Sequence, residues 1–192
     1  MAMRVIGGGA KGRRLLVPKG LTVRPTAARV KESLFNILPH EFSGMKVLDL
    51  FAGSGNVSIE ALSRGAAEAV LVEASARSVA TIKENLHRLG LSGRAQLWAT
   101  PVARALRSLA KRGAGFEFIF LDPPYDKGLV GASLKLIDSG NLLKASGTLV
   151  AEHSARETVK ARYGALLLND QRHYGDTRLS FFKRETQTDI SA

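Results

Sequence analysis

The stretch KVLDLFAGSGNVSIEAL, Lys46–Leu62, decides the fold that this sequence predicts. Its first six residues are mostly apolar and predict a buried strand over 46–51. Gly53 and Gly55 then allow the backbone to turn tightly, and a helix is expected from Gly53 to Arg64. A strand that leads through a glycine turn into a helix is typical of an α/β unit.

The same alternation continues along the chain and extends this reading to the whole fold. The final segments, 165–174 and 177–185, flank the turn Tyr174-Gly175-Asp176 and predict a β-hairpin. Repeated strand–helix units predict a mostly parallel sheet with helices on both faces, to which the hairpin adds antiparallel strands. The other strands are expected at 69–74, 95–98, 116–122 and 147–153, and the helices at 75–90, 101–111, 131–138 and near 156–161.

The first 40 residues depart from this rhythm and are predicted to be a basic extension of a main domain at 41–192. They hold eight Lys and Arg but one acid, which accounts for +7 of the net charge of +11. A concentrated positive end favours a polyanionic partner such as nucleic acid; the alternative is a solvated basic surface that promotes solubility. A glycine-rich loop or small hairpin is followed by an expected helix at 26–38, capped by Thr26. Its apolar stripe comprises Val30, Leu34, Ile37 and Leu38.

The composition excludes several classes of protein and site. The 192 residues contain no cysteine and four histidines without metal-binding spacing, so neither a disulfide nor a metal site is expected. No run approaches the roughly 20 apolar residues of a membrane span. The N-terminus also lacks the apolar stretch of a secretory signal. We therefore expect a cytoplasmic protein without membrane contact.

The glycine turn carries the first chemical signal. Asp49 stands four residues before Gly53, where a carboxylate can hold a ligand amine directly or through water. Glu73 ends the second strand, 18 residues after Gly55, and an acid in this place accepts hydrogen bonds from ribose hydroxyls. S-adenosylmethionine has an amine and a ribose but no phosphate, and it suits this pattern better than a pyrophosphate cofactor. A structural turn and a surface acid are the alternatives.

The second signal is LDPPY, Leu121–Tyr125, at the end of the fourth strand. Proline cannot continue a central ladder, so the strand stops and the local backbone is stiff. Asp122 and the carbonyl of Pro123 are then fixed acceptors, which can grip the N–H bonds of a weakly nucleophilic base amine. Tyr125 offers a flat face on which a base extruded from its stack can lie. The alternative is a proline-stopped strand that carries a surface tyrosine.

Together these residues resemble a known family. DLFAGSGNVSIEAL paired with LDPPY is similar to class I methyltransferases of the D/N-P-P-Y type. The flanking MRVIGGGAKGRRLLVP, LTVRPTAARVKESLFNIL and YGDTRLSFFK resemble the bacterial 16S ribosomal RNA guanine-N2 methyltransferase family (RsmD-type). The resemblance implies a Rossmann-like, doubly wound, seven-stranded sheet, with S-adenosyl-L-methionine as methyl donor. It further implies a guanine of 16S rRNA as target, as naked RNA or in a 30S assembly intermediate, and we expect a monomer.

The resemblance also assigns residues to roles. In these enzymes an acid often follows the third strand and contacts adenine, whereas this chain has Trp98-Ala99-Thr100, so backbone groups or Thr100 are expected there. Asp122, Pro123, Pro124 and Tyr125 are the implied catalytic residues. The implied cofactor residues are Asp49, Phe51, Gly53, Gly55, Glu73, Ala74, Ala99, Thr100 and Asp122. The implied RNA-contacting residues are Lys11, Arg13, Arg14, Arg24, Thr26 and Arg29.

Three rival functions remain open at this point. An N6-adenine methyltransferase acting on DNA shares the D-P-P-Y chemistry, but it usually needs a separate target-recognition region. A nicotinamide-dependent oxidoreductase predicts a complete G-x-G-x-x-G fingerprint, whereas Ser58 stands in its third position. A non-catalytic RNA-binding module would keep the basic extension and bind RNA equally well with or without S-adenosylmethionine.

Overall fold

The computed structural model describes residues 3–18, 25–125 and 127–185, with the side chains of 25–28 excepted. The chain forms two units, Met1–Pro101 and Val102–Ala192, and each is described by itself. Arg24 lies outside the described residues, as does the side chain of Thr26.

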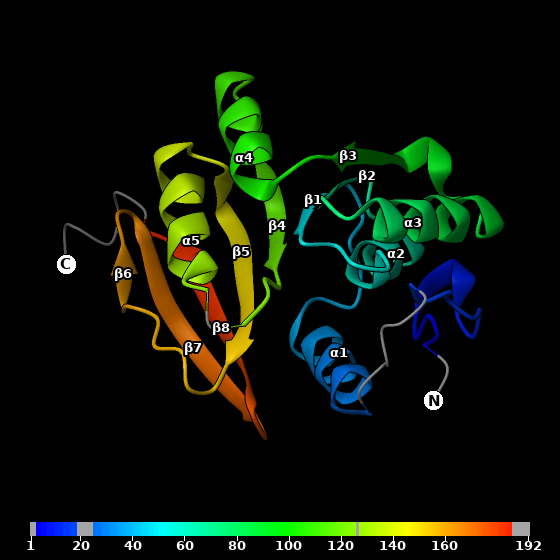
Figure 1. Cartoon of the computed structure of the whole chain (residues 1–192), viewed down its shortest axis with the longest axis horizontal. Helices are drawn as coiled ribbons and strands as arrows, with labels where there is room; N and C mark the ends of the chain where they lie inside the picture. The colour runs from blue at the N-terminus through cyan, green and yellow to red at the C-terminus, as the bar shows by residue number, and fades with distance from the viewer. Residues whose placement is uncertain (1–2, 19–24, 126, 186–192) are drawn as a thin grey trace. The chain divides into compact units, whose positions relative to one another are not determined.

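The first unit is built around three parallel strands in the order β3-β2-β1 (Figure 1). Lys46 pairs with Glu68, and Ala69 pairs with Ala95, so the three strands begin at the same edge. Residues 47–50 are buried in β1 and 69–72 in β2, as expected for parallel strands covered on both faces. The strands are β1 (Lys46–Leu50), β2 (Glu68–Glu73) and β3 (Ala95–Ala99), and the helices are η1 (Gly8–Ala10), α1 (Pro25–Ile37), α2 (Asn56–Ser63), α3 (Ala76–Arg88) and η2 (Ser92–Arg94).

The second unit contains the remaining strands in the order β4-β5-β8-β7-β6. β4 and β5 are parallel, whereas β5–β8, β8–β7 and β7–β6 are antiparallel. Helices α4 and α5 lie side by side, and α5 packs against β5 (Figure 1). The elements are α4 (Val102–Lys111), β4 (Phe116–Leu121), α5 (Leu129–Ser139), β5 (Leu143–Ser154), β6 (Arg162–Tyr163), β7 (Leu166–Tyr174) and β8 (Thr177–Arg184).

The predicted fold class is confirmed: the chain is α/β, with parallel strands followed by an antiparallel C-terminal hairpin, β7–β8. Among the described residues, seven strands have at least five residues, and the two-residue β6 is an addition. No helix within the described ranges is long and apolar enough to cross a membrane.

Three local predictions were wrong. The segment near 156–161 forms no helix: Glu157 N donates to Ser154 O in a turn, and the residues from there to β6 have no regular secondary structure. Helix α1 begins at Pro25, so Thr26 lies within its first turn and does not cap it. Ile37, predicted to belong to the apolar stripe, is 43% exposed, and the fully buried residue is Phe35.

Candidate active site

The turn after β1 has a sharply bent backbone with three left-handed residues. Phe51, Gly53 and Gly55 all have positive φ angles, of 63°, 59° and 75°. A Cβ on Gly55 would lie 3.2 Å from Leu71 Cδ2, so a larger residue would require Leu71 to shift in addition to the strained backbone angle. Phe51 adopts the left-handed conformation without being glycine, a strain that recurs at functional sites. The turn therefore needs the glycines that the sequence analysis singled out.

Glu73 lies against this glycine turn. Its Oε2 accepts a hydrogen bond from Gly53 N at 2.9 Å, and its Oε1 accepts one from Ser75 N at 2.8 Å. The carboxylate is half-buried, and the neighbouring Ala74 is exposed. The acid at the end of β2 thus joins two loops at the carboxyl ends of the strands, where ligands bind in open α/β sheets.

Asp49 is more deeply buried than its predicted role suggested. The residue is 2% exposed, and its Oδ2 accepts from Ser58 N at 3.1 Å and from Ser58 Oγ at 2.8 Å. Burial raises the pKa of Asp49 to about 7, against the effect of the Ser58 hydrogen bonds. The carboxyl group therefore takes up a proton more readily than an exposed aspartate, and its bonds to Ser58 order the first turn of α2.

Thr100 offers an unused polar group at the end of β3. Its backbone N donates to Glu73 O at 3.1 Å, which fixes the residue beside the acid. Its Oγ1 is buried and has no hydrogen-bond partner among the described residues. Ala99, the last residue of β3, is exposed. An orphaned hydroxyl of this kind fits the edge of a bound adenine, because a ligand can supply the missing partner.

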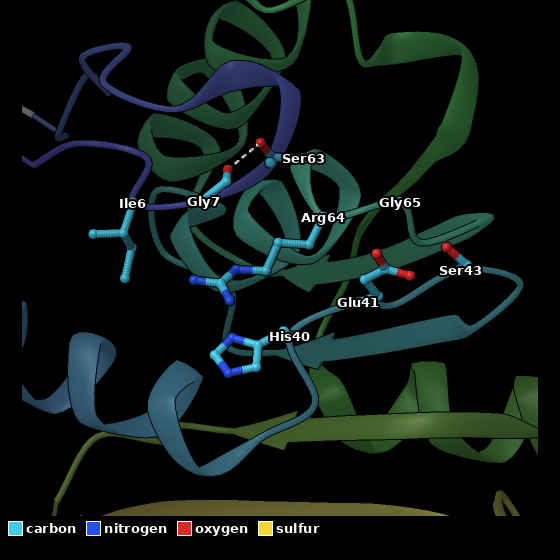
Figure 2. Close-up of a pocket in the computed structure, with 9 residues that line it drawn as sticks. Ile6, Gly7, His40, Glu41, Ser43, Ser63, Arg64 and Gly65 are labelled. Atoms are coloured by element: carbon cyan, nitrogen blue, oxygen red, sulfur yellow. Dashed lines mark hydrogen bonds between the residues drawn. The ribbon is translucent and has the colours of Figure 1, made fainter.

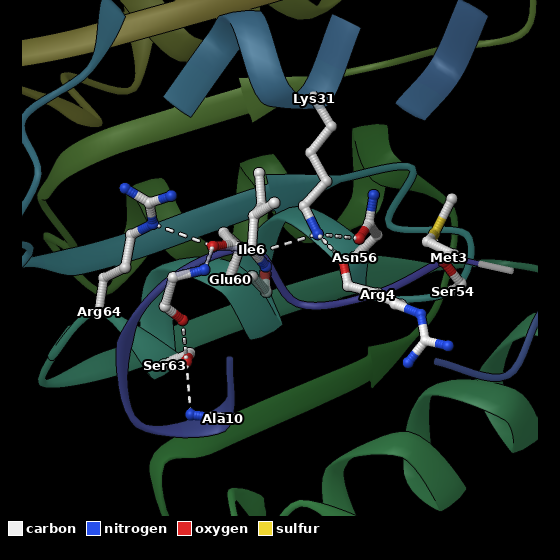
Figure 3. Close-up of polar contacts among 12 residues, drawn as sticks. Met3, Arg4, Ile6, Ala10, Lys31, Ser54, Asn56, Glu60, Ser63 and Arg64 are labelled. Atoms are coloured by element: carbon white, nitrogen blue, oxygen red, sulfur yellow. Dashed lines mark hydrogen bonds and ion pairs between the residues drawn. The ribbon is translucent and has the colours of Figure 1, made fainter. Parts of the chain in front are cut away.

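A buried charged cluster, which the sequence analysis missed, holds the N-terminal extension in place (Figure 3). Glu60 on α2 has no exposed surface and lies 2.9 Å from the ammonium of Lys31, which is 5% exposed. Arg64 Nε donates to Glu60 at 3.0 Å, and the backbone N–H groups of Ile6 and Gly7 donate to it at 2.9 and 2.7 Å. Burial lowers the pKa of Lys31, and Glu60 opposes that shift. Four donors on one carboxylate offset much of its desolvation cost.

The extension also contacts the glycine turn through Asn85, a residue of α3 that is 1% exposed. Asn85 Nδ2 donates to the carbonyl oxygens of Leu16 and Ser54 at 3.0 Å each, and its Oδ1 accepts from Leu16 N at 2.8 Å. Lys31 Nζ donates in addition to Asn56 Oδ1 at 2.6 Å. The extension and the turn after β1 therefore share the same buried polar side chains.

A cavity of about 610 Å³ lies where the extension meets the segment before β1 (Figure 2). Gly7, His40, Glu41 and Arg64 are among the residues that line it. Ser63 Oγ closes one side by donating to Gly7 O at 2.6 Å. None of the described residues predicted to bind the cofactor or RNA lines this cavity, so it belongs to the docking of the extension.

Four of the predicted RNA-contacting residues are on the surface of the first unit. Lys11, Arg13, Arg14 and Arg29 are exposed. Arg13 Nη2 donates to the carbonyl of Arg88 at 2.8 Å, which anchors one guanidinium against the end of α3. The extension around them is a small hairpin closed by a bridge between Arg4 and Arg14.

In the second unit, the LDPPY motif begins at Leu121, the last residue of β4, so it lies at the end of the fourth strand as predicted. Asp122 is half-buried, Pro123 is buried and Pro124 is exposed. Leu121 pairs with Ala151 of β5, and the β4–β5 pairing ends at this point. The chain thus turns at the carboxyl end of β4, where a buried strand gives way to a polar corner.

The hydroxyl of Tyr125 is held by the C-terminal hairpin. Tyr125 Oη and Thr177 Oγ1 lie 3.1 Å apart, and Thr177 is 5% exposed at the start of β8. Deeper in the same strands, His153 Nε2 lies 2.7 Å from Ser180 Oγ, and burial lowers the pKa of this histidine. The hairpin therefore fixes the edge of the tyrosine ring, a role for Thr177 that was not predicted, although YGDT belongs to the segment that carried the resemblance.

Within each unit, the structure brings together part of what the sequence predicted. In the first, Glu73 contacts Gly53 and Thr100 at the strand ends, and the buried Asp49 accepts hydrogen bonds from Ser58. No group of three or more potential metal-ligating His, Asp or Glu side chains occurs in the part of the chain that the structure describes.

Comparison with known proteins gives close relatives over almost the whole chain. YlbH of Bacillus subtilis (strain 168) is 42% identical over 182 residues, which cover 95% of this chain and 99% of YlbH. Ribosomal RNA small subunit methyltransferase D of Escherichia coli (strain K12) is 33% identical over 193 residues, covering 99% of this chain and 94% of that protein.

Solved structures with a similar fold include proteins that are also similar in sequence. The structure of YhhF from Escherichia coli has a TM-score of 0.82 at 33% identity and covers 97% of this chain and 100% of that chain. The crystal structure of SMU.776 complexed with SAH has a TM-score of 0.69 at 18% identity, covering 88% and 53%, and that likeness concerns the fold alone. A family model described as Conserved hypothetical protein 95 matches residues 3–183. The chain therefore belongs to the Conserved hypothetical protein 95 family, and its RsmD-type resemblance is confirmed.

Proposed function

We propose that this protein transfers the methyl group of S-adenosylmethionine to the exocyclic N2 amino group of a guanine in small-subunit ribosomal RNA. The observation that carries the proposal is the full-length similarity to the Escherichia coli protein named ribosomal RNA small subunit methyltransferase D, at 33% identity. The LDPPY corner, the glycine turn and the basic extension each supply a part that this reaction needs.

The first unit offers what the cofactor requires. Glu73 accepts two N–H groups and is half-exposed, which supports a role for its carboxylate as acceptor for the ribose hydroxyls. The left-handed glycines leave room for the methionine end beside the turn. The unpartnered hydroxyl of Thr100 suits the adenine edge in place of the missing acid. When bound, S-adenosylmethionine supplies an electrophilic methyl group on a sulfonium.

The LDPPY corner offers what the acceptor requires. The N2 amine of guanine is a poor nucleophile because its lone pair is delocalised into the ring. Two acceptors, the Asp122 carboxylate and the Pro123 carbonyl, would hold its N–H bonds and favour a pyramidal nitrogen. The nitrogen then attacks the methyl carbon as the carbon–sulfur bond breaks, and the cationic amine releases its proton, so no strong base is needed before attack.

A direct experiment tests the proposal and separates its closest rival. Protein is incubated with methyl-labelled S-adenosylmethionine and undermodified small subunits, naked 16S rRNA or double-stranded DNA, and the labelled nucleosides are identified. We expect label in N2-methylguanosine from one of the rRNA substrates. Label in N6-methyladenine would establish the rival activity, and an absence of transfer to every substrate would refute methylation.

Replacing Glu73 by alanine is expected to weaken S-adenosylmethionine binding by about 10- to 100-fold, since hydrogen bonds to a charged group contribute about 1.5–3 kcal/mol. The loss also frees Gly53 N and Ser75 N, which loosens the turn. Isothermal titration calorimetry gives the affinity. Glu68→Ala, at the opposite end of β2, is the matched control. Affinity within twofold of wild type would remove Glu73 from the cofactor site.

Replacing Arg13 and Arg14 by alanine together is expected to weaken RNA binding and to lower its salt dependence. Each phosphate contact contributes about 0.7–0.9 to the slope of log K against log salt, so the slope should fall by about 1.5. Filter binding of 16S rRNA over a salt series measures it. Lys46→Ala with Lys83→Ala removes two exposed charges from the same unit as a control, and equal slopes for the two variants would contradict the assignment.

A further inference from the structure

Helices α4 and α5 border a cavity of about 510 Å³ in the second unit. Arg107 of α4, Lys135 of α5 and Lys160 of the segment before β6 all line it. Gly128 and Gly131 leave part of its wall as bare backbone, and Tyr163 lies buried at its edge, with its hydroxyl accepting from Lys160 N at 3.1 Å. Three cations thus face a single hollow.

These three cations have no side-chain partner among the residues that the structure describes. Arg107, Lys135 and Lys160 are exposed, and none forms an ion pair or a side-chain hydrogen bond with any residue in the described ranges. Two acids of the second unit are engaged with other groups. Asp138 on α5 accepts from Ala165 N at 2.9 Å, and Glu185 pairs with an arginine other than these three. The mutual repulsion of the three cations is therefore left for solvent or a ligand to offset.

The positive charge continues along α4 beyond the cavity. The buried face of the helix is apolar and includes Leu106 and Leu109. Its exposed face carries Arg104, Arg107 and Lys111, which are spaced three and four residues apart and so lie on one side. At a rise of 1.5 Å per residue this stripe is about 10 Å long. A stripe of that length fits an extended polyanion better than a single small anion.

We propose that the α4–α5 cationic cavity binds backbone phosphates of the RNA substrate, as a second contact surface in addition to the N-terminal extension. This inference rests on the proposed function for the identity of the polyanion. Arg107, Lys135 and Lys160 neutralise phosphates, and the glycine-lined wall lets the backbone approach closely. Such contacts position the RNA without reading its sequence, so the surface serves docking and register.

The test compares two triple variants of equal charge. Arg107→Gln with Lys135→Gln and Lys160→Gln removes the cavity cations. Lys144→Gln with Arg172→Gln and Lys183→Gln removes three exposed cations elsewhere in the same unit, each of which has a partner within the protein. With unmethylated 16S rRNA as probe, the cavity variant is expected to bind at least about tenfold more weakly and to lower the salt slope by about 2–3. Equal affinity and slope for the two variants would overturn the inference.

Two further measurements distinguish this inference from the proposed function on which it rests, and an RNA-binding surface from a site for a small anion. Methyl transfer by the wild-type protein tests the proposed function independently of the cavity. If the wild type transfers methyl groups but the two triple variants bind RNA equally well, the RNA-binding role of the cavity is refuted and the proposed function stands. If the two triple variants differ in RNA binding but the wild type transfers no methyl group, methylation is refuted and the cavity remains an RNA-binding surface. The binding of inorganic phosphate is measured by calorimetry in parallel. If the cavity variant loses phosphate binding but keeps its RNA affinity, the cavity is an anion site that does not bind RNA.

Discussion

Asp122→Ala is expected to lower methyl transfer by about 10²–10³-fold while S-adenosylmethionine affinity stays within a few-fold of wild type. The magnitude is that of losing one preorganised hydrogen-bonding group which acts chiefly in the transition state. Asp122 is half-buried and follows β4 directly, and Pro123 behind it is buried, so the carboxylate has little freedom. Single-turnover transfer to rRNA and calorimetric cofactor binding measure the two effects separately.

Asp122→Asn is the matched variant, because an amide keeps one acceptor oxygen at the same place and removes the charge. We expect its activity to lie between those of wild type and Asp122→Ala, which separates acceptor geometry from charge. Thermal unfolding of both variants tests whether the corner is intact. If Asp122→Ala remains folded and transfers methyl within a few-fold of wild type, the grip on the amine is wrong.

The fold was predictable because its signals are local. β1, β2 and β4 consist mostly of apolar residues, interrupted only by Asp49 in β1 and Glu117 in β4, as expected for parallel strands buried on both faces. The glycines after β1 mark a turn that needs positive φ angles. The helix predicted near 156–161 does not form. The end of this segment is instead bonded to β7, since Leu168 N donates to Ala161 O. Such a non-local hydrogen bond leaves no periodic trace in the sequence.

The candidate site was only partly predictable, for a similar reason. Glu73 was found through its spacing from the glycines, and the structure places it on Gly53. Lys31 was counted in the basic extension as one more surface charge, yet it is 5% exposed and paired with Glu60. The two residues are 29 positions apart on different helices. Nothing in either helix alone shows that these charges meet, so the sequence overstated the charge available to RNA.

Glu60→Ala is expected to destabilise the protein by about 3–5 kcal/mol, since removal of one partner leaves a buried charge uncompensated. Lys31 would keep its buried ammonium beside Arg64, and the N–H groups of Ile6 and Gly7 would lose their acceptor. The extension should detach from α2 before the remainder unfolds, because these bonds hold it there. Denaturant unfolding gives the free energy, and hydrogen exchange at Ile6 and Gly7 reports the detachment.

Two variants show whether the buried charge is the cause. Lys31→Met combined with Glu60→Gln removes both charges and keeps an amide oxygen for the backbone donors, so its loss of stability should be much smaller than that of Glu60→Ala. Glu68→Ala breaks the exposed pair with Lys46 and should cost no more than about 1 kcal/mol. Equal losses for Glu60→Ala and the double variant would show that backbone hydrogen bonding or packing, and not the ion pair, secures the extension. Unchanged exchange at Ile6 and Gly7 in Glu60→Ala would mean that Asn85 and its contacts with Leu16 suffice to hold it.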